Sequence, residues 1–370
     1  MKTNHYRKYV WRSKLKFRKI VIAVALSIPG ASAFACASCG CSLNTDIGTQ
    51  GMGMTSGWSL DLRYDTLNQN KLRYGTKGIS QSQAANTTNG ATGGPAEVEG
   101  YTQNNYITAS LDYNDGENWG LTTVVPFIVR NHMTYGSNSD DGVGGFPTGE
   151  NGYSSKGSGI GDIKLIGRYF GFSEQKDWGL QFGVKLPTGS NSQSAVANSG
   201  GTVAVDPGLQ RGSGSTDLIG GIYKFGFVND LENWGYFAQA QYQAAVIVTN
   251  VPNSLVGLSS GPSDAPTVST GGSYRPGNSL NVNVGVNYQA FEKWVPTLQL
   301  NVINKRADSG TAADTWATGG TLAYLTPGVL YRLTEQTQVY ANLQLPVYQN
   351  VNGIQLTPSY IASMGVRVHF

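Results

Sequence analysis

The chain has 370 residues, of which 13% are charged, with 49 glycines, 20 tyrosines and a formal net charge of +3. A soluble protein usually carries about 25% charged residues, and one of this length shows helical periodicity in several segments. Beyond the N-terminal segment the charged fraction is low and we find no helical periodicity. Both observations argue against a soluble globular protein. Low charge with abundant glycine and aromatic residues is typical of a transmembrane β-barrel.

Residues 1–35 have the three parts of a secretory signal peptide. Eight lysines and arginines precede an apolar run at residues 20–28, and small residues lead to a cleavage position after Ala35. The run is too short for a membrane anchor, because a spanning helix needs roughly 20 apolar residues. Without these eight basic residues the total of 26 falls to 18 against 23 acidic residues, a net charge of −5. The mature chain is therefore acidic, and nothing in its composition supports nucleic-acid binding.

The three cysteines, Cys36, Cys39 and Cys41, stand together in a glycine-rich segment, residues 36–57, that shows no periodicity. Their spacing lacks the following histidine of a haem attachment site and the second cysteine pair of a structural zinc site. A disulfide or spare thiol, a metal or partner contact, and a lipid on Cys36 all remain open. We expect a periplasmic tether or plug, with the three cysteines as the candidate metal ligands.

From Trp58 onward, apolar and polar residues alternate with the two-residue period of a β-strand. Ile163 and Leu165, for example, fall on one face of a strand while Lys164 falls on the other. We predict about twelve strands, at residues 58–66, 101–114, 119–130, 157–172, 178–189, 212–228, 234–248, 278–290, 294–304, 319–333, 338–347 and 358–370. The predicted fold class is all-β, a transmembrane antiparallel up-and-down β-barrel of about 12 strands over residues 58–370.

Five tryptophans begin predicted strands at a nearly constant interval. Trp58, Trp119, Trp178, Trp234 and Trp294 are separated by 61, 59, 56 and 60 residues. In a soluble sandwich such rings usually scatter through the core, whereas in a membrane protein tryptophan is enriched at the interface with water. The spacing favours an interfacial belt at one end of the strands.

The connections between the predicted strands alternate in length. Those near Asp115, Glu174, Asp230, Glu292 and Glu335 are a few residues long, and the others are long or polar. In bacterial outer-membrane barrels the short turns face the periplasm and the long loops face the medium. An even number of strands then puts both chain ends at the periplasmic side.

The last predicted strand ends on Phe370, after apolar residues at alternate positions. A terminal phenylalanine on an amphipathic strand resembles the signal by which outer-membrane proteins are recognised for insertion. We therefore expect a protein of the bacterial, Gram-negative outer membrane, whose partners include outer-membrane lipid and the insertion machinery that reads Phe370.

Pro126, Pro187 and Pro346 sit late in strands that are predicted to rise toward the long-loop side. Proline lacks the backbone donor of the ladder and is normally kept to strand ends and bulges. Two interpretations remain open. The prolines end regular pairing near the outer rim, or they leave a gap through which an apolar solute passes sideways into the membrane.

The inward faces of the predicted strands carry charged and amide side chains. The candidate lumen-lining residues are Asp61, Arg63, Asp162, Lys164, Arg168, Lys185, Gln239, Gln241, Asn283 and Arg367. In a barrel of this size such groups can hydrogen-bond to one another and fill the interior, or they can line a narrow watery pore. Both interpretations remain open. Asp308 and Asp314 fall in predicted loops, where we expect solvated carboxylates.

No catalytic motif stands out, because the chain lacks a nucleophile elbow, a zincin helix motif and a phosphate-binding loop. His132 is assigned to a loop. His369 lies on the inward face of the last strand, where Ser363 and Asp162 are conceivable partners in a hydrolase site. Since no nucleophile is marked out, we expect no enzyme activity and no cofactor.

Three short motifs carry a resemblance to a known family. They are GIGD at residues 159–162 followed by Arg168 and Tyr169, KLPTG at residues 185–189, and GSGSTD at residues 212–217. The motifs are similar to those of outer-membrane proteins grouped as meta-pathway phenol-degradation transporters, over most of residues 58–370. The resemblance implies a small barrel that takes up hydrophobic or aromatic compounds, and the cysteine segment is outside the matched pattern.

The expected function is that of a porin-like outer-membrane channel or transporter for passive uptake of small, hydrophobic or aromatic solutes. The alternative is a non-conducting barrel that contacts a periplasmic metal or redox partner through its N-terminal cysteines. Single-channel current in planar bilayers distinguishes the two, because only the first produces an open state.

Overall fold

The computed structural model describes residues 56–137, 152–198, 200–228, 231–253 and 269–370, all within one compact unit. The expected signal peptide and all but the last two residues of the cysteine segment lie outside this part of the chain. Among the described helices, none has the length and apolarity that crossing a membrane requires. Most of the described chain is antiparallel β-sheet.

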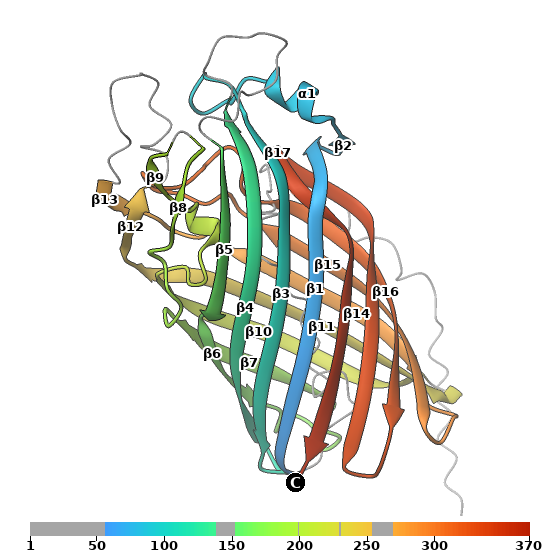
Figure 1. Cartoon of the computed structure of the whole chain (residues 1–370). Coiled ribbons are helices and arrows are strands. Elements are labelled where there is room, and N and C mark those ends of the chain that lie inside the picture. Colours follow the sequence, from blue (N-terminus) through green and yellow to red (C-terminus); the bar gives the residue numbers. More distant parts are fainter. Residues whose placement is uncertain (1–55, 138–151, 199, 229–230, 254–268) are drawn as a thin grey trace, which may run out of the picture. The chain divides into compact units, whose positions relative to one another are not determined.

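Eleven strands of the described chain follow one another around a single sheet (Figure 1). In chain order they are β1 (Gly57–Gly75), β3 (Glu97–Asn114), β4 (Trp119–Ser137), β6 (Ile163–Tyr169), β7 (Trp178–Leu186), β10 (Ser215–Val228), β11 (Leu231–Val248), β14 (Ser279–Tyr288), β15 (Trp294–Lys305), β16 (Gly320–Arg332) and β17 (Thr337–His369). Each strand pairs antiparallel with its neighbours in this order. β17 also pairs with β1, which closes the sheet into a barrel.

β17 crosses the barrel wall twice. Its first part pairs with β16 from Gln338 to Val351, and its second part pairs with β1 from Val351 to His369. The amide of His369 donates to the carbonyl of Gln336 at 2.9 Å, so the two ends of β17 lie together. The chain reverses near Gly353, where φ is +44° and a side chain would be strained. The described wall therefore has twelve passes, which confirms the predicted antiparallel barrel of about twelve strands.

Alternation along each strand sorts side chains between the outer face and the interior. In β7, Phe182 is 63% exposed on the outer face, while its neighbour Gln181 is 1% exposed on the inner face. A closed sheet pairs backbone groups between strands, as lipid requires because it offers them no hydrogen-bond partner. This is the fold of bacterial outer-membrane proteins, and it confirms the predicted fold class and location.

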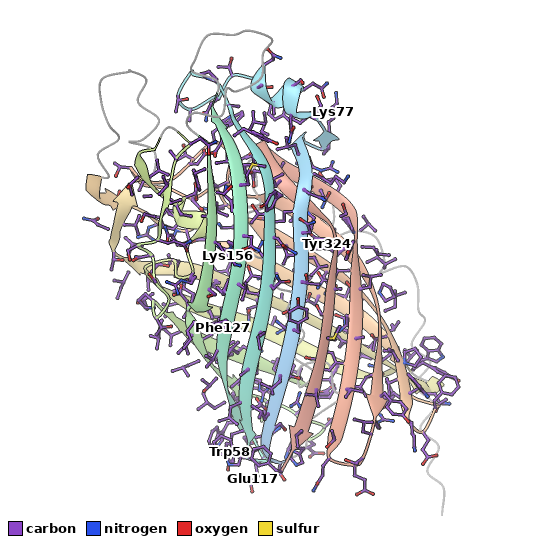
Figure 2. All side chains as sticks on the ribbon, in the orientation of Figure 1. Trp58, Lys77, Glu117, Phe127, Lys156 and Tyr324 are labelled. Atoms are coloured by element: carbon purple, nitrogen blue, oxygen red, sulfur yellow. The ribbon has the colours of Figure 1, made fainter. Side chains whose placement is uncertain are left out.

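The five regularly spaced tryptophans lie at or near the starts of strands, at their short-turn ends. Figure 2 labels Trp58 at this end of the barrel. Trp58 and Trp119 pack on the two sides of Tyr113, with ring centroids 4.9 and 5.3 Å apart. Trp234 makes the same kind of contact with Tyr288, at 4.9 Å. These exposed Trp and half-buried Tyr rings form an aromatic girdle, because their amphipathic rings favour the boundary between lipid and water. Short turns face the periplasm in bacterial outer-membrane barrels, so we assign this end, which also holds the C-terminus, to the periplasmic side.

Several strands reach further toward the extracellular side than predicted. β1 continues to Gly75, β4 continues to Ser137, and β5 (Tyr153–Ile160) begins inside a segment predicted as a loop. The outward residues there, such as Asn131, are often polar, so the alternation of apolar and polar residues disappears although the strand continues. The prediction that His132 lies in a loop is wrong, because it belongs to β4 and is 1% exposed.

Short elements cover the extracellular end. They are β2 (Lys77–Gly78), α1 (Gln81–Ala85), β8 (Ser194–Val196), β9 (Thr202–Ala204), the 3-10 helix η3 (Pro207–Leu209), β12 (Asn250–Asn253) and β13 (Ser269–Ser273). Ser80 and Gln83 form a capping box at the start of α1. Its alanines pack on Val98 and Leu356, so α1 is held against the barrel by a small apolar core (Figure 1).

The barrel wall is interrupted between β5 and β6, which together make one pass. β4 pairs with β6 up to Val124 and with β5 from Phe127 onward. Between them, the carbonyl of Pro126 accepts a hydrogen bond from the amide of Gly161 at 2.8 Å. The ladder is broken there because proline offers no backbone donor. We call this interruption the wall break.

On its other side, β5 lacks a barrel strand as neighbour among the described residues. β7 ends at Leu186, immediately before Pro187, and β10 begins only at Ser215. The bridge between Tyr153 and Ala197 joins β5 to the intervening loop, residues 187–214. In the described chain, this loop therefore lies beside the edge of β5 that faces away from β4. We call it the inner loop, for the contacts described below.

Candidate functional site

A lysine network holds the wall break together from inside. The Lys185 ammonium lies 2.9 Å from a carboxylate oxygen of Asp217 and 3.4 Å from one of Asp162, and all three side chains are nearly buried. Lys185 also donates to the hydroxyls of Ser213 and Ser215. Because Asp162 accepts hydrogen bonds from the amide and hydroxyl of Ser213, the same network fixes the inner loop to the wall.

A second network lies closer to the periplasmic end. Arg168 contacts Asp112 at 2.5 Å, and Arg367 approaches the other oxygen of Asp112 at 3.8 Å. The Thr122 hydroxyl donates to the same carboxylate at 2.6 Å. Two cations and a hydroxyl therefore surround one buried carboxylate, which compensates the cost of removing it from water.

The remaining predicted inward residues also lie in polar groups. Arg63 pairs with Asp65 at 2.8 Å, and the Tyr340 hydroxyl donates to Asp61 at 2.9 Å. The other contacts are Lys164 to Gln243, Gln239 and Gln241 to Gln181, and Asn301 to Asn283. All ten candidate lumen-lining residues thus lie on the inner face. Their role along a solute path stays a prediction.

The interior contains a cavity of about 290 Å³ beside the wall break. Apolar side chains form part of its lining: Tyr106, Val124, Pro126, Ile128 and Ile303. The polar part includes three of the predicted residues near the break: Asp162, Lys164 and Lys185. This volume lies at the small end of ligand cavities, roughly 300–1,000 Å³, and a single aromatic ring fits it.

Arg130 holds the inner loop inside the barrel. Its guanidinium donates to the carbonyls of Gln210 at 3.1 Å and Gly208 at 3.4 Å, both in the inner loop. The same side chain donates to Asn104 on β3 at 2.5 Å and to the Tyr106 hydroxyl at 3.0 Å. Arg130 is buried, so these contacts join the loop to the wall within the interior.

Glycines on β5 leave room for this loop. A Cβ atom on Gly157 would overlap the side chain of Gln193, and one on Gly159 would overlap that of Arg211. Glycine lets these two side chains of the loop reach the strand, and at Gly159 the φ of +148° also disfavours any other residue. The inner loop therefore narrows the extracellular half of the barrel.

The three prolines occupy different structural positions. Pro126 faces the wall break, Pro187 follows the end of β7, and Pro346 lies at an irregularity in the pairing of β17 with β16. Pro187 matches the interpretation in which a proline ends regular pairing. Pro126 lies inside a continuous strand, so the interruption affects its partner strand instead.

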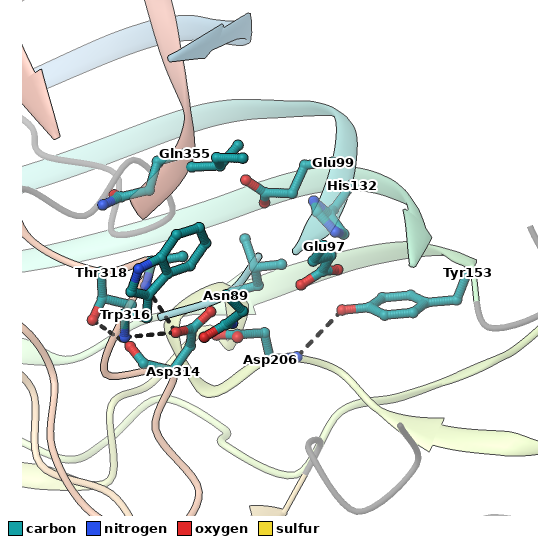
Figure 3. Close-up of a pocket in the computed structure, with 13 residues that line it drawn as sticks. Asn89, Glu97, Glu99, His132, Tyr153, Asp206, Asp314, Trp316, Thr318 and Gln355 are labelled. Carbon is teal, nitrogen blue, oxygen red and sulfur yellow. Dashed lines mark hydrogen bonds between the residues drawn. The ribbon is translucent and has the colours of Figure 1, made fainter. Parts of the chain in front are cut away.

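A second pocket, rich in carboxylates, lies where β3 begins at the extracellular end. Figure 3 shows its lining. Glu97 and Glu99 of β3 line it together with Asp206 and Asp314 from two loops. The expectation of a solvated Asp314 is wrong, because it accepts amide hydrogen bonds inside this pocket. The expectation of a solvated Asp308 is also wrong, because Asp308 is 1% exposed and forms an ion pair with Lys305 at 2.7 Å.

Burial raises the pKa of Asp206 to about 8, and the neighbouring charges of Asp314, Glu97 and Asp308 act in the same direction. The folded protein therefore binds this proton more tightly than the unfolded chain does. The contribution of Asp206 to the free energy of unfolding is full below pH about 4 and falls up to pH about 8. In Asp206→Asn, the denaturation midpoint should therefore decrease less between pH about 4 and pH about 8 than it does in the unchanged protein. An unchanged slope would contradict the assignment.

The residues considered for a hydrolase site do not come together. Nδ1 of His369 lies 3.1 Å from the Ser59 hydroxyl, whereas Asp162 belongs to the Lys185 network. Among the described residues, no group of three or more His, Cys, Asp or Glu side chains is placed to hold a metal ion. Cys36, Cys39 and Cys41 lie outside that part of the chain.

No family model and no curated protein matches the chain. The fold is similar to that of an outer-membrane channel of Pseudomonas putida F1, with 11% identity, a TM-score of 0.54, and coverage of 86% of this chain and 97% of that chain. The toluene transporter TodX of P. putida shows 10% identity and a TM-score of 0.42 over 89% and 93% of the two chains. The toluene transporter TbuX of Ralstonia pickettii shows 13% identity and a TM-score of 0.43 over 86% and 90%.

The similarity to the P. putida F1 channel shows that the chain has the fold of an outer-membrane β-barrel. The similarity to the two toluene transporters is weaker, and no conclusion is based on it. The narrower resemblance to meta-pathway phenol-degradation transporters is not confirmed, since no family model matches.

Proposed function

We propose that the protein is an outer-membrane channel for passive uptake of small hydrophobic or aromatic solutes. The observation that carries this proposal is the cavity of about 290 Å³, which combines apolar walls with charged groups and touches the wall break. A ring can pack against Tyr106, Val124 and Ile128, while Lys164 offers a hydrogen bond to a ring substituent.

The proposed exit is the wall break. Its inner side is lined by Pro126, Asp162 and the inner-loop residue Gly212, which also line the cavity. Its neighbours on the outer face, Phe127 and Ile160, are exposed and apolar. A hydrophobic solute that leaves there enters lipid directly, which avoids the cost of passing through water again.

The function is tested by uptake of radiolabelled toluene into Gram-negative cells with intact lipopolysaccharide. Cells that express the chain should take up the label several-fold faster than cells with an empty vector, and glucose uptake serves as a polar reference. Equal toluene uptake would refute the proposal. Single-channel recording distinguishes the proposed channel from the alternative function, because a non-conducting barrel with a cysteine-bound partner gives no open-state current.

The exit route predicts a specific loss in Gly161→Leu. A Cβ at this position would lie 2.8 Å from Cδ1 of Ile128 and 3.2 Å from Cγ of Pro126. The leucine side chain would therefore fill the break. We expect toluene uptake to fall toward the empty-vector rate, while ion conductance through the barrel is retained.

The matched control is Gly220→Leu, on the exposed face of β10, where no atom lies within 4 Å of the added Cβ. It places the same side chain on the barrel at a site away from the break, so uptake should be unchanged. Equal uptake by both variants and the unchanged protein would exclude the break as the exit.

A further inference from the structure

The carboxylate pocket draws its acids from three separate segments of the chain. Glu97 and Glu99 start β3, Asp206 precedes η3 in the inner loop, and Asp314 lies between β15 and β16. Figure 3 shows all four side chains around one space. The pocket therefore joins the barrel wall to two extracellular loops.

Among the described residues, no cationic side chain pairs with these four carboxyl groups. Each acid accepts hydrogen bonds: Thr134 donates to Glu97 at 2.6 Å, and the amide of Leu356 donates to Glu99 at 3.3 Å. Yet within the described chain, none of the four forms an ion pair with lysine, arginine or histidine. Confined carboxylates without a counter-charge either hold protons or attract a cation from solution.

His132 supplies an independent sign of a ligand. Its Nδ1 lies 2.8 Å from the Thr102 hydroxyl, but its Nε2 is buried and lacks a hydrogen-bond partner. The ring lines the same pocket as Glu97 and Glu99 (Figure 3). Buried polar atoms are nearly always paired, so an unpaired Nε2 that faces a polar pocket indicates a water or an ion there.

The size of the pocket limits what can occupy it. Its volume of about 30 Å³ admits an ion with one or two waters and is too small for an aromatic ring. Among the described residues, no three His, Cys, Asp or Glu side chains are placed to ligate one ion directly. Water and the side-chain oxygens of Asn89, Thr318 and Gln355 in the lining would complete the coordination, which suits hard divalent cations.

We propose that the carboxylate pocket binds a hydrated divalent cation, Mg²⁺ or Ca²⁺, between β3, the inner loop and the Asp314 loop. The ion links these segments and so fixes the loops over the extracellular mouth. This site is separate from the solute cavity, so its test is independent of the transport proposal.

The test uses Tb³⁺, Ca²⁺ and Mg²⁺ with the purified full barrel in detergent. Trp316 lines the pocket, so its excitation should sensitise luminescence from bound Tb³⁺. We expect saturable luminescence that Ca²⁺ or Mg²⁺ displaces, with a Ca²⁺ dissociation constant on the order of 0.1–1 mM. The double variant Glu99→Gln with Asp206→Asn should weaken binding by at least about tenfold, because it removes two of the four carboxyl groups that can ligate the ion.

The matched control is Glu117→Gln with Asp177→Asn, the same loss of charge at the periplasmic end, and it should bind like the unchanged protein. If the double variant in the pocket fails to fold, Trp316→Phe replaces it. That variant should lose the sensitised luminescence but keep Ca²⁺ binding by calorimetry. The proposal is overturned if the unchanged protein shows no saturable binding below about 10 mM, or if the pocket variants behave as the control does.

Discussion

Arg130→Met should increase single-channel conductance several-fold. Arg130 joins the inner loop to β3 and β4 through Gly208, Gln210 and Asn104. A hydrogen bond from a charged donor contributes roughly 1.5–3 kcal/mol, so the two bonds to the loop together oppose its release by several kcal/mol. Methionine keeps the apolar stem without these donors, and the loop then leaves the lumen for part of the time.

Planar-bilayer recording measures this effect directly, as the size and dwell time of the open state. Arg332→Met is the matched control, because Arg332 also donates to a backbone carbonyl, that of Glu292 at 3.1 Å, but on the periplasmic surface. Its conductance should equal that of the unchanged protein. If Arg130→Met also leaves conductance unchanged, the inner loop does not narrow the conducting path.

The sequence predicted the barrel because a lipid-facing strand carries its pattern locally. Ile163, Lys164 and Leu165 alternate between two environments, and that alternation is legible without any tertiary information. The aromatic girdle was predictable for the same reason, since the five regularly spaced tryptophans lie at or near the start of a strand. Above the lipid both faces of a strand are polar, so the extensions of β1 and β4 carried no such signal.

The carboxylate pocket could not be predicted in this way. The pairing of β3 with β4 is irregular between Glu97, Glu99 and Tyr101, so the two-residue period fails where the acids lie. Asp206 and Asp314 join them only through the folding of two distant loops. His132 gave no signal either, because its burial depends on the same loops. Position in the chain therefore suggested solvated groups where the fold makes a pocket.

Arg130 illustrates a second limit. An inward arginine on a strand is expected to meet a carboxylate, but its acceptors are an amide, a phenol and two backbone carbonyls. Backbone carbonyls of a loop carry no sequence signature. The sequence predicted the wall break only in part. Pro126 suggested an interruption but did not indicate that its partner strand breaks at Gly161.

Lys185→Met should lower the free energy of unfolding by about 3–5 kcal/mol, because it leaves Asp162 and Asp217 buried without their cation. Denaturant unfolding of the lipid-reconstituted barrel measures the change. Adding Asp162→Asn and Asp217→Asn to this variant should recover most of the loss, since neutral amides no longer repel each other.

The comparison that isolates burial is Lys224→Met. Lys224 contacts Asp177 at 2.7 Å, a similar distance, but its side chain is 50% exposed and that of Asp177 is 28% exposed. Water solvates the remaining carboxylate there, so the expected loss is below about 1 kcal/mol. Lys185 and Lys224 thus differ mainly in their access to water. Equal losses for both variants would mean that the interior around the wall break is as wet as the periplasmic surface, and the apolar cavity proposed for the solute would have no support.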